Sequence, residues 1–195
     1  MNETSPQVIV IAGPNGAGKT TLAPFLLRDT LDVLEYVNAD PIALGLSGFD
    51  PESVALQAGR VMLNRLRDLG EQRRTYAFES TLAARSYVRR IERLRAEEYR
   101  FQLMFLWLRS ADLAVERVRE RVRAGGHHVA EEVVRRRYGA GLKNFWRLYQ
   151  PLADAWSVYD NSESAKSLPI ASGGREEPFL VRDQDSWASF VTTKP

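Results

Sequence analysis

Residues 13–20 read GPNGAGKT and match the phosphate-binding pattern G-x-x-x-x-G-K-[ST]. The pattern follows an apolar, β-branched segment at 7–13 and precedes apolar residues at helical spacing, so a strand leads into the loop and a helix leaves it. In that context successive backbone N–H groups converge on phosphate oxygens at the positive end of the helix. The motif therefore predicts an α/β fold that binds a nucleoside triphosphate.

The residue types inside this loop suit the task. Glycine at positions 13, 16 and 18 allows positive φ and a close approach of the backbone to an anion. Lys19 supplies a charge for the β- and γ-phosphates, and Thr20 offers a hydroxyl to a Mg²⁺ ion that bridges them. We predict ATP and Mg²⁺ as cofactors, with the ATP-binding residues Gly13, Pro14, Asn15, Gly16, Ala17, Gly18, Lys19, Thr20 and Thr21.

Strand-like and helix-like segments alternate along the chain, which predicts a parallel five-stranded sheet covered by helices on both faces. The strands are expected at 7–13, 33–40, 75–80, 101–108 and 155–161. Helices are expected from Gly18, with Pro24 as a kink or an early end; from Pro51 to Gly70, with Asp50 as N-cap; over Val88–Leu94; from Ser110 to Arg123; and at 131–149.

The end of the chain has a different pattern. The segment LPIASGGREEPFLV at 168–181 predicts two strands around a Gly-Gly turn. We predict a single P-loop domain over 1–195, with a core at about 7–162 and a C-terminal extension at 163–195 that carries a small β-hairpin.

The composition excludes several classes of site and disfavours secretion or membrane insertion. The chain has no cysteine, which excludes disulfides, thiolate metal sites and cysteine nucleophiles. The first apolar segment lacks a preceding basic region, and the segment FQLMFLWL at 101–108 is far shorter than the roughly 20 residues that span a bilayer. We therefore expect a soluble, cytoplasmic protein without membrane attachment.

Basic residues gather in the middle of the chain. Residues 60–147 hold 21 Lys and Arg against 11 Asp and Glu, and 23 of the 27 basic residues in the whole chain are arginine. Arginine suits phosphate binding, although solvated helix faces explain many of these side chains equally well. A nucleic-acid-binding module would rest on arginine content alone, because no aromatic stacking platform or reader motif accompanies it. Nucleic acid is therefore not the expected partner.

Three carboxylates lie where ligands of an open α/β sheet bind. Asp40, Glu79 and Asp160 each stand at or just past the carboxyl end of a predicted strand. A kinase needs a carboxylate that orients the acceptor hydroxyl and accepts its proton, and Asp40 and Glu79 are nearest the phosphate loop in this topology. Each acid has an ordinary alternative as a cap or loop carboxylate, and Asp40 precedes a proline that could merely start a turn.

Arginines and glycines further along predict a lid. Arg117 and Arg121 are four residues apart and share one helix face. The loop GGHHVA at 125–130 begins with two glycines, so it is expected to close over ATP and bring positive charge to the γ-phosphoryl group. The histidine pair in this loop has no further histidine beside it in the chain, which disfavours a zinc site. Residues 135–137 are all arginine and circle a helix, so at most two of them face a ligand.

Taken in order, these segments resemble the zeta-toxin-like P-loop kinases, in particular their short bacterial branch. The matching segments are AGPNGAGKTT at 12–21, VNAD at 37–40, FESTL at 78–82, ERVRERVRAGGHHVAEEVVRRRY at 116–138 and PLADAWSVYDNS at 151–162. The resemblance implies a nucleoside-kinase-like fold and ATP-dependent phosphorylation of UDP-N-acetylglucosamine on the 3′-hydroxyl of its amino sugar. It also implies an antitoxin protein as a partner.

The same resemblance implies roles for individual residues. Asp40 corresponds to the catalytic base, and Glu79, with Ser80 and Thr81, to the acceptor-binding residues. Lys19 and Thr20 correspond to the phosphate and Mg²⁺ ligands. The catalytic set is thus Asp40, Lys19, Arg117 and Arg121.

Two positions depart from the pattern of the family. A second lid arginine is expected where this chain reads GGHHVA, so His127, His128 or Arg136 would have to take its role. Ala130 stands where this branch is expected to have proline.

Two other activities are compatible with the same motif. A kinase of another nucleotide or nucleoside would use the same loop and acids. A P-loop NTPase that acts as a regulatory switch would need a Walker B strand, for which TYAFE at 75–79 is the nearest candidate and WSVYD at 156–160 the next.

Overall fold

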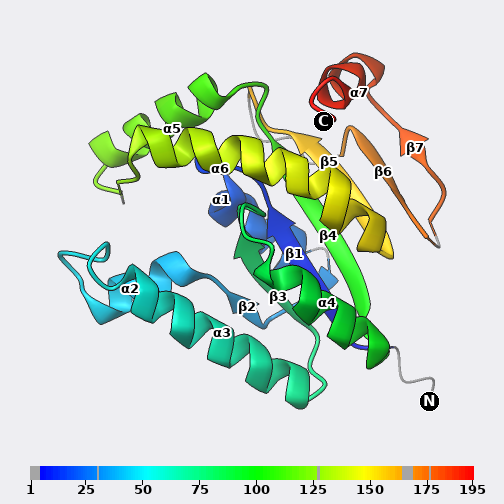
Figure 1. The fold of residues 1–195 in the computed structure, drawn as a ribbon, viewed down its shortest axis with the longest axis horizontal. Helices are drawn as coiled ribbons and strands as arrows, with labels where there is room; N and C mark the ends of the chain where they lie inside the picture. Colours follow the sequence, from blue (N-terminus) through cyan, green and yellow to red (C-terminus); the bar gives the residue numbers. More distant parts are fainter. Residues whose placement is uncertain (1–4, 30, 127, 164–168, 176) are drawn as a thin grey trace.

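A seven-stranded sheet forms the centre of the computed structural model, which describes residues 5–29, 31–126, 128–163, 169–175 and 177–195. The strand order is β2-β3-β1-β4-β5-β6-β7 (Figure 1). The strands are β1 (Gln7–Ala12), β2 (Tyr36–Val37), β3 (Tyr76–Ser80), β4 (Arg100–Trp107), β5 (Ala155–Asp160), β6 (Ala171–Gly174) and β7 (Leu180–Val181).

The first five strands are parallel, as predicted, and β1 is central. Val10 lies opposite Phe78 on one side and Leu103 on the other, and all three side chains are buried. A continuous run of β-branched residues suits this position because helices cover both faces of a parallel sheet. The carboxyl ends of β1, β2 and β3 therefore meet at one edge, where the glycine-rich loop begins.

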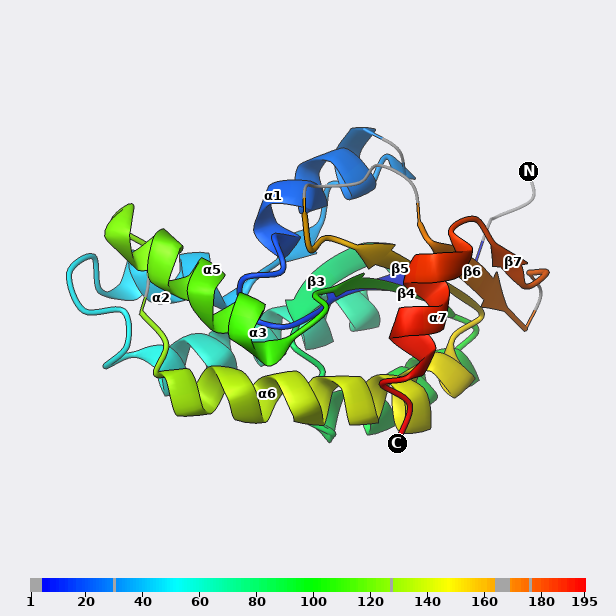
Figure 2. The same cartoon turned by 90° about the horizontal axis from the view of Figure 1, so that it is seen from above.

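Helices pack on both faces of the sheet. The helices are α1 (Lys19–Ala23), α2 (Ala39–Leu46), α3 (Ala55–Glu71), α4 (Ser86–Ala96), α5 (Ala111–Arg123), α6 (Glu131–Asn144) and α7 (Gln184–Val191). One core cluster joins the sheet to α3, α4, α6 and α7, and a second joins it to α1 and α5. Figure 2 shows α1 and α6 on opposite sides of the sheet.

The helix after the phosphate loop ends early. The α-helical hydrogen bonding of α1 stops at Ala23, and a π-helical turn continues from Pro24 to Asp29. Proline has no backbone N–H and its ring crowds the preceding turn, so the change at Pro24 follows from its chemistry. A similar π-turn, Phe145–Tyr149, extends α6 to the length predicted for that helix.

Two segments differ from the sequence prediction at the site edge. The strand predicted at 33–40 is only two residues long, because Asn38 begins α2 by accepting a hydrogen bond from the backbone N–H of Asp40 at 2.9 Å. The next helix, α3, begins at Ala55 rather than Pro51, and Asp50 instead accepts from the Ser53 N–H in the turn before it. Asp40 therefore belongs to the first turn of a helix that sequence reasoning missed.

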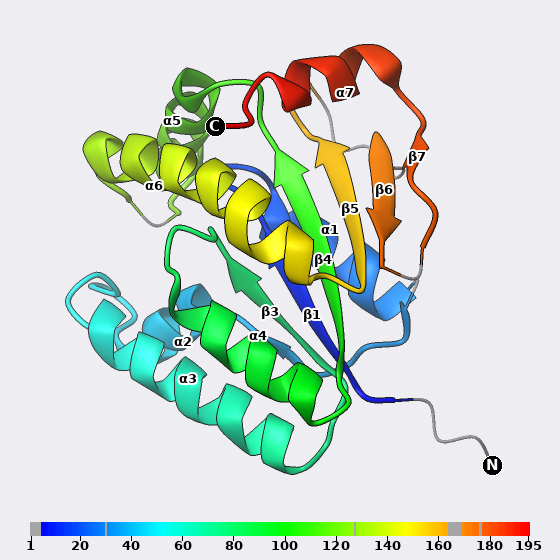
Figure 3. The ribbon, with the colours of Figure 1, turned by 45° about the vertical axis from the view of Figure 1, so that its right-hand side comes forward.

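The C-terminal hairpin extends the main sheet. Strand β6 pairs antiparallel with β5 and with β7 (Figure 3). Gly174 lies inside β6, not in the turn as predicted, and a Cβ there would come within 2.1 Å of the Asp154 carbonyl oxygen. The helix α7 was not predicted; its Phe190 is buried against Trp107 of β4 and against Phe145, which follows α6. Within the described part of the chain, no helix is long and apolar enough to cross a bilayer.

Candidate active site

A cavity of about 660 Å³ opens at the carboxyl ends of β1 and β3, above the glycine-rich loop. Its walls come from that loop, the first turns of α1 and α2, the end of β3, and one face each of α5 and α6. The residues lining it are Asn15, Gly16, Gly18, Lys19, Thr20, Thr21, Asn38, Ala39, Asp40, Glu79, Ser80, Thr81, Arg117, Glu120, Arg121, Ala124 and Arg137. Most of the predicted site residues are thus brought to one place.

The loop has the backbone that the motif requires. Gly13, Gly16 and Gly18 have φ values of +145°, +78° and +77°. A Cβ on Gly13 would lie 2.2 Å from the carbonyl oxygen of Leu106 on β4, so only glycine fits there. At Gly18, where α1 begins, a Cβ would lie 2.7 Å from Nδ2 of Asn161, whose amide donates to the Ala17 carbonyl at 2.7 Å. The loop therefore packs against β4 and is hydrogen-bonded to the residue that follows β5.

Lys19 is folded back over the loop. Its Nζ donates to the carbonyl oxygens of Gly13 at 3.0 Å and Pro14 at 2.9 Å, and it lies 3.9 Å from Oε1 of Glu79. Burial lowers the pKa of Lys19; the carboxylates of Glu79 and Asp40 oppose that shift, and Arg121 and Arg137 add to it. The ammonium group is therefore poorly solvated, and its nearest partners are two carbonyl oxygens of the loop and the Glu79 carboxylate.

Glu79, at the end of β3, is the centre of a hydrogen-bond network. Its Oε2 accepts from the hydroxyl of Thr20 at 3.0 Å, from the hydroxyl of Tyr36 at 2.5 Å, and from Nδ2 of Asn38. Burial, together with the negative charge of Glu79, raises the pKa of Tyr36, so its hydroxyl stays a proton donor. The acid is thus fixed beside Thr20, the residue expected to contact the metal.

Asp40 projects at the junction of two cavities. A second cavity, of about 650 Å³, lies between α2, the start of α3 and the lid loop. It shares Thr20, Asn38, Ala39, Asp40 and Arg121 with the first. Its other walls are largely apolar and include Pro41, Leu44 and Phe49, with acidic groups from Asp50 and Glu52. A donor in the first cavity and an acceptor in the second would meet at Asp40.

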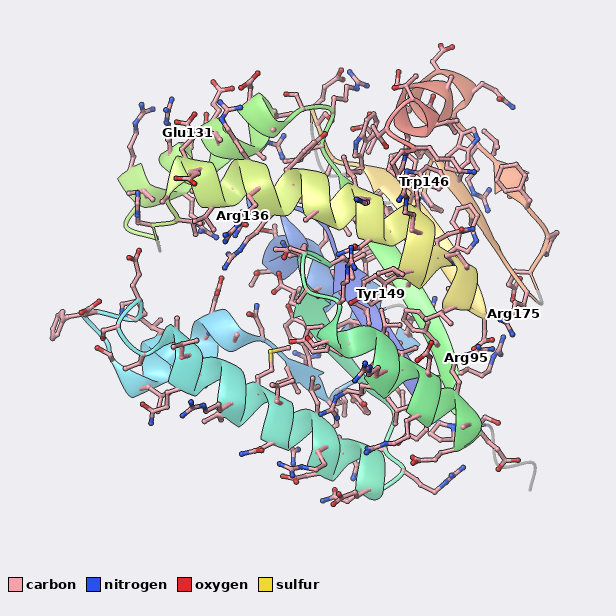
Figure 4. The ribbon with its side chains drawn as sticks, in the orientation of Figure 1. Arg95, Glu131, Arg136, Trp146, Tyr149 and Arg175 are labelled. Carbon is pink, nitrogen blue, oxygen red and sulfur yellow. The ribbon has the colours of Figure 1, made fainter. Side chains whose placement is uncertain are left out.

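The arginines differ in how they face these cavities. Arg117 lines the first cavity and donates to the Ser162 carbonyl at 2.8 Å, and Arg121 lines both cavities. Of the three consecutive arginines on α6, Arg137 lines the first cavity, whereas Arg135 pairs with Glu131 and Asp112 outside it. Arg136 is exposed and extends from the side of α6 that faces α2 (Figure 4). Arg136, which the sequence offered as one candidate for the second lid cation, lines neither of these two cavities, whereas Arg137 lines the first.

The predicted lid connects α5 to α6. Gly125, with φ of +85°, follows α5, and Gly126 packs against Arg121. His128 lies in the second cavity wall, with Nδ1 3.5 Å from Oε1 of Glu52. His127 lies outside the described residues. Ala130 immediately precedes α6 with φ of −57°, a value that proline also adopts.

Asp160, the third strand-end acid, is engaged elsewhere. It is 2% exposed, and its oxygens accept from Arg109 at 2.9 Å and from the hydroxyl of Ser162 at 2.5 Å. The strand β5 ends next to β4 and away from α2, so this acid stabilises the loop after β5 instead of lining either cavity. The alternative reading of Asp160 as a loop carboxylate fits its contacts.

Tyr36, Asn38, Glu120 and Arg137 are at the site and were not singled out from sequence. The two residues from the β2 end could have been found from strand alternation, because Tyr36 and Asn38 share a side of β2 with each other and, through the parallel register, with Glu79. The arrangement of Arg137 could not, since three consecutive arginines leave its direction undetermined.

The oxygens of Thr20 and Glu79 suit Mg²⁺, which prefers hard oxygen ligands and is usually held together with nucleotide phosphates. Among the described residues, no group of three His, Cys, Asp or Glu side chains forms a protein-only metal site. The residues present therefore fit a metal that arrives with a nucleotide, with Thr20 as a direct ligand and Glu79 beside it. When bound, that ion would neutralise phosphate charge.

The phosphate loop, the parallel strand order 2-3-1-4-5 and the strand-end acids define a P-loop NTPase of the kinase-like type. Residues 8–146 match the AAA domain family designated AAA_33, and the chain belongs to this family.

Three similar proteins illustrate the range of this fold. An uncharacterized protein of Haemophilus influenzae is 27% identical over 132 residues, covering 68% of this chain and 92% of its own length. The complex of AvrRxo1-ORF1 and -ORF2 with ATP gives a TM-score of 0.71 at 15% identity over 100% of this chain, which spans 66% of that protein's length. The PezAT chromosomal toxin-antitoxin system of Streptococcus pneumoniae gives 0.62 at 14% identity, covering 85% and 72%.

Proposed function

We propose that the protein is an ATP-dependent kinase that transfers the γ-phosphoryl group to a hydroxyl of a small molecule. The observation that carries this proposal is the position of Asp40, at the junction of a cationic cavity over the phosphate loop and a second cavity of nearly equal size. An enzyme that uses only water as acceptor has no need of a second cavity beside its phosphate loop. The ATP present in the AvrRxo1 complex supports the choice of donor.

The donor half of the reaction uses the first cavity. Backbone N–H groups of the loop and the first turn of α1, such as those of Gly16, Gly18 and Lys19, would bind the phosphates. The side chains of Lys19, Arg117, Arg121 and Arg137 would place positive charge around them. The transferring group spreads negative charge over its oxygens, so fixed cations stabilise the transition state more than the ground state. Mg²⁺ would join this set through Thr20.

The acceptor half depends on Asp40. The acceptor oxygen attacks the γ-phosphorus while the bond from that phosphorus to the β–γ bridging oxygen breaks, and ADP leaves with the electron pair. The acceptor proton passes to a carboxylate oxygen of Asp40. Asn38 fixes the backbone of Asp40 through the helix cap, which places the residue beside the phosphate loop.

The acceptor itself is proposed from the family resemblance to be UDP-N-acetylglucosamine, phosphorylated on its amino sugar as in zeta-toxin-like kinases. Ser80 and Thr81 line the cavity beside Asp40 and can donate hydrogen bonds to sugar hydroxyls. The loop that carries them is anchored to α6, since Asn144 donates to the Leu82 carbonyl at 2.7 Å and Tyr149 to that of Ala84 at 2.6 Å. A rigid loop of this kind suits the positioning of an acceptor.

Further features of this proposal concern the whole chain. We propose that residues 1–195 act as one domain in the cytoplasm, where ATP is available, and that 125–130 closes over the nucleotide. We also propose an antitoxin as a partner of this chain. Two structural neighbours support it: AvrRxo1-ORF1 is in a complex with ORF2, and PezAT is a toxin-antitoxin system.

A transfer assay tests the proposal. The protein is incubated with ATP labelled at the γ-phosphate and a panel of UDP-sugars and nucleosides, and labelled product is separated from inorganic phosphate. We expect label on UDP-N-acetylglucosamine. Transfer should fall by about 10³-fold in Lys19→Ala, because this variant lacks the ammonium charge that stabilises the transferring phosphoryl group. Lys143→Ala, at an exposed position on α6, is the matched control.

A regulatory NTPase is the second candidate, because Glu79 of the segment TYAFE contacts Thr20 as a Walker B acid would. That protein would hydrolyse ATP at the same rate with and without every acceptor of the panel. Such a result, with no labelled organic product, would contradict the kinase proposal.

A further inference from the structure

The carboxylate of Glu79 is surrounded by donors from the nucleotide side of the site. The parallel register pairs Tyr36 with Ala77 and Val37 with Phe78, so Asn38 comes level with Glu79. Tyr36, Asn38 and Glu79 therefore project on one side of the sheet, the side on which α1 packs. Thr20, in the first turn of α1, reaches the same carboxylate from above.

These contacts occupy much of what the carboxylate can accept. An ionised carboxylate has about four lone-pair sites on its two oxygens. Oε2 accepts from Tyr36, Asn38 and Thr20, while Oε1 lies 3.3 Å from the Thr20 hydroxyl and 3.9 Å from Lys19 Nζ. Each of these groups belongs either to the first turn of α1 or to the end of β2. Oε2 is therefore fully engaged, and the groups nearest Oε1 are Thr20 and Lys19 of the phosphate loop and α1, not the acceptor side.

The hydroxyl of Tyr36 donates to this carboxylate at 2.5 Å. The ring of Tyr36 is half-buried on the face of the sheet that α1 covers, so its hydroxyl has a fixed position. The alternative is that this bond merely satisfies a half-buried polar group. That alternative predicts a loss of stability without any change in ligand binding.

We infer that Tyr36 is a positioning residue, whose hydroxyl holds the Glu79 carboxylate against Thr20 and so commits this acid to the magnesium–nucleotide complex instead of the acceptor. The inference rests on the nucleotide-binding half of the proposed function, and it does not require that the acceptor be a sugar. It departs from the acceptor-binding role that the family resemblance implies for Glu79.

The test measures binding, so that it does not depend on catalysis. Affinity for a fluorescent ATP analogue is measured across a Mg²⁺ titration and in EDTA for the wild-type protein and for Tyr36→Phe, which keeps the ring. We expect the Mg²⁺ concentration for half-maximal effect to rise about tenfold, the size usual for one hydrogen bond to a charged group, with affinity in EDTA unchanged. Tyr99→Phe is the control: its buried hydroxyl bonds the Arg74 carbonyl at 3.0 Å, far from the site.

A double-mutant cycle separates positioning from packing. Glu79→Gln should weaken the Mg²⁺ effect at least as much as Tyr36→Phe, and adding Tyr36→Phe to Glu79→Gln should have no further effect. Additive effects of the two substitutions, or a Mg²⁺ titration of Tyr36→Phe equal to that of the wild type, would overturn the inference. A raised KM for the acceptor with an unchanged Mg²⁺ titration would also overturn it, because Glu79 would then serve the acceptor.

These outcomes are distinct from failure of the proposed function. If no acceptor is ever phosphorylated, the Mg²⁺ titration still decides whether Tyr36 positions Glu79. If Tyr36→Phe folds poorly, Glu79→Gln still tests the premise of the inference, since unchanged Mg²⁺-dependent binding in that variant removes the acid from the metal side and overturns it.

Discussion

Asn38 holds the two acids of the site in different ways: its Oδ1 accepts the backbone N–H of Asp40 at 2.9 Å, while its Nδ2 donates to the carboxylate of Glu79. One amide side chain thus begins α2 and anchors the end of β3. Because both acids depend on the same residue, their separation is built into the junction of β2 and α2. Asp40 faces both cavities, and Glu79 faces Thr20.

The buried ammonium of Lys19 predicts a dependence of stability on pH. Its pKa is lowered below 10.5 in the folded protein, chiefly by burial, so between the lowered value and 10.5 the unfolded chain binds more protons. The free energy of unfolding should therefore rise with pH across this window. Lys19→Met lacks this contribution. The difference in urea midpoint between the wild type and Lys19→Met should shift in favour of the wild type as pH rises toward 10.5.

Tyrosines of raised pKa titrate in both proteins, so their effect cancels in this difference. Lys143→Met, at an exposed site, should show no such trend. A difference between wild type and Lys19→Met that stays constant or falls over this range would show that Lys19 is not destabilised by its surroundings.

Substitution at Gly13 tests how closely the loop packs on the sheet. A Cβ in Gly13→Ala would lie 2.2 Å from the Leu106 carbonyl oxygen, at a φ of +145° that other residues avoid. We expect a loss of about 2 kcal/mol or more in the free energy of unfolding, measured by urea denaturation. Gly59→Ala, in the middle of α3 with no atom near the added Cβ, should instead stabilise the protein by about 0.5–1 kcal/mol. Equal stability of the two variants would contradict the observed loop packing.

Arg137 and Arg135 lie two residues apart on α6 and make a matched pair. Arg137→Ala removes a cation from the wall of the phosphate cavity, so kcat/KM for phosphoryl transfer should fall by about 10- to 100-fold. Arg135→Ala removes partly exposed ion pairs with Glu131 and Asp112, and its effect should stay below about twofold. A larger fall in kcat/KM for Arg135→Ala than for Arg137→Ala would show that the phosphates meet the other face of α6.

Much of the fold follows from local sequence patterns. The strand–loop–helix order around Lys19 predicts the site edge. The apolar run at 101–108 predicts β4, because a strand covered on both faces has a nearly continuous apolar sequence. The helix α2 was missed because VNAD reads as a strand with an acidic end, whereas the Asn38 side chain caps a helix there. The helix α7 was missed because its burial depends on aromatic partners distant in sequence, such as Phe145.

The site was predicted to a similar extent. Residues on the loop and at strand ends, such as Lys19, Asp40 and Glu79, could be placed because the topology brings strand ends together. The direction of a side chain on a helix or in a network could not. The contact of Glu79 with Tyr36, and the exclusion of Asp160 by Arg109, depend on tertiary packing that no spacing rule contains.

Asp40→Asn separates phosphoryl transfer from nucleotide binding. Transfer of the γ-phosphoryl group should fall by about 10²- to 10⁴-fold, because the amide cannot accept the acceptor proton. Binding of ATP should change by less than about twofold, since the phosphates bind the loop and the arginines. Asp68→Asn, exposed on α3, serves as control and should leave both quantities unchanged. Full transfer activity in Asp40→Asn would show that Asp40 is not the base.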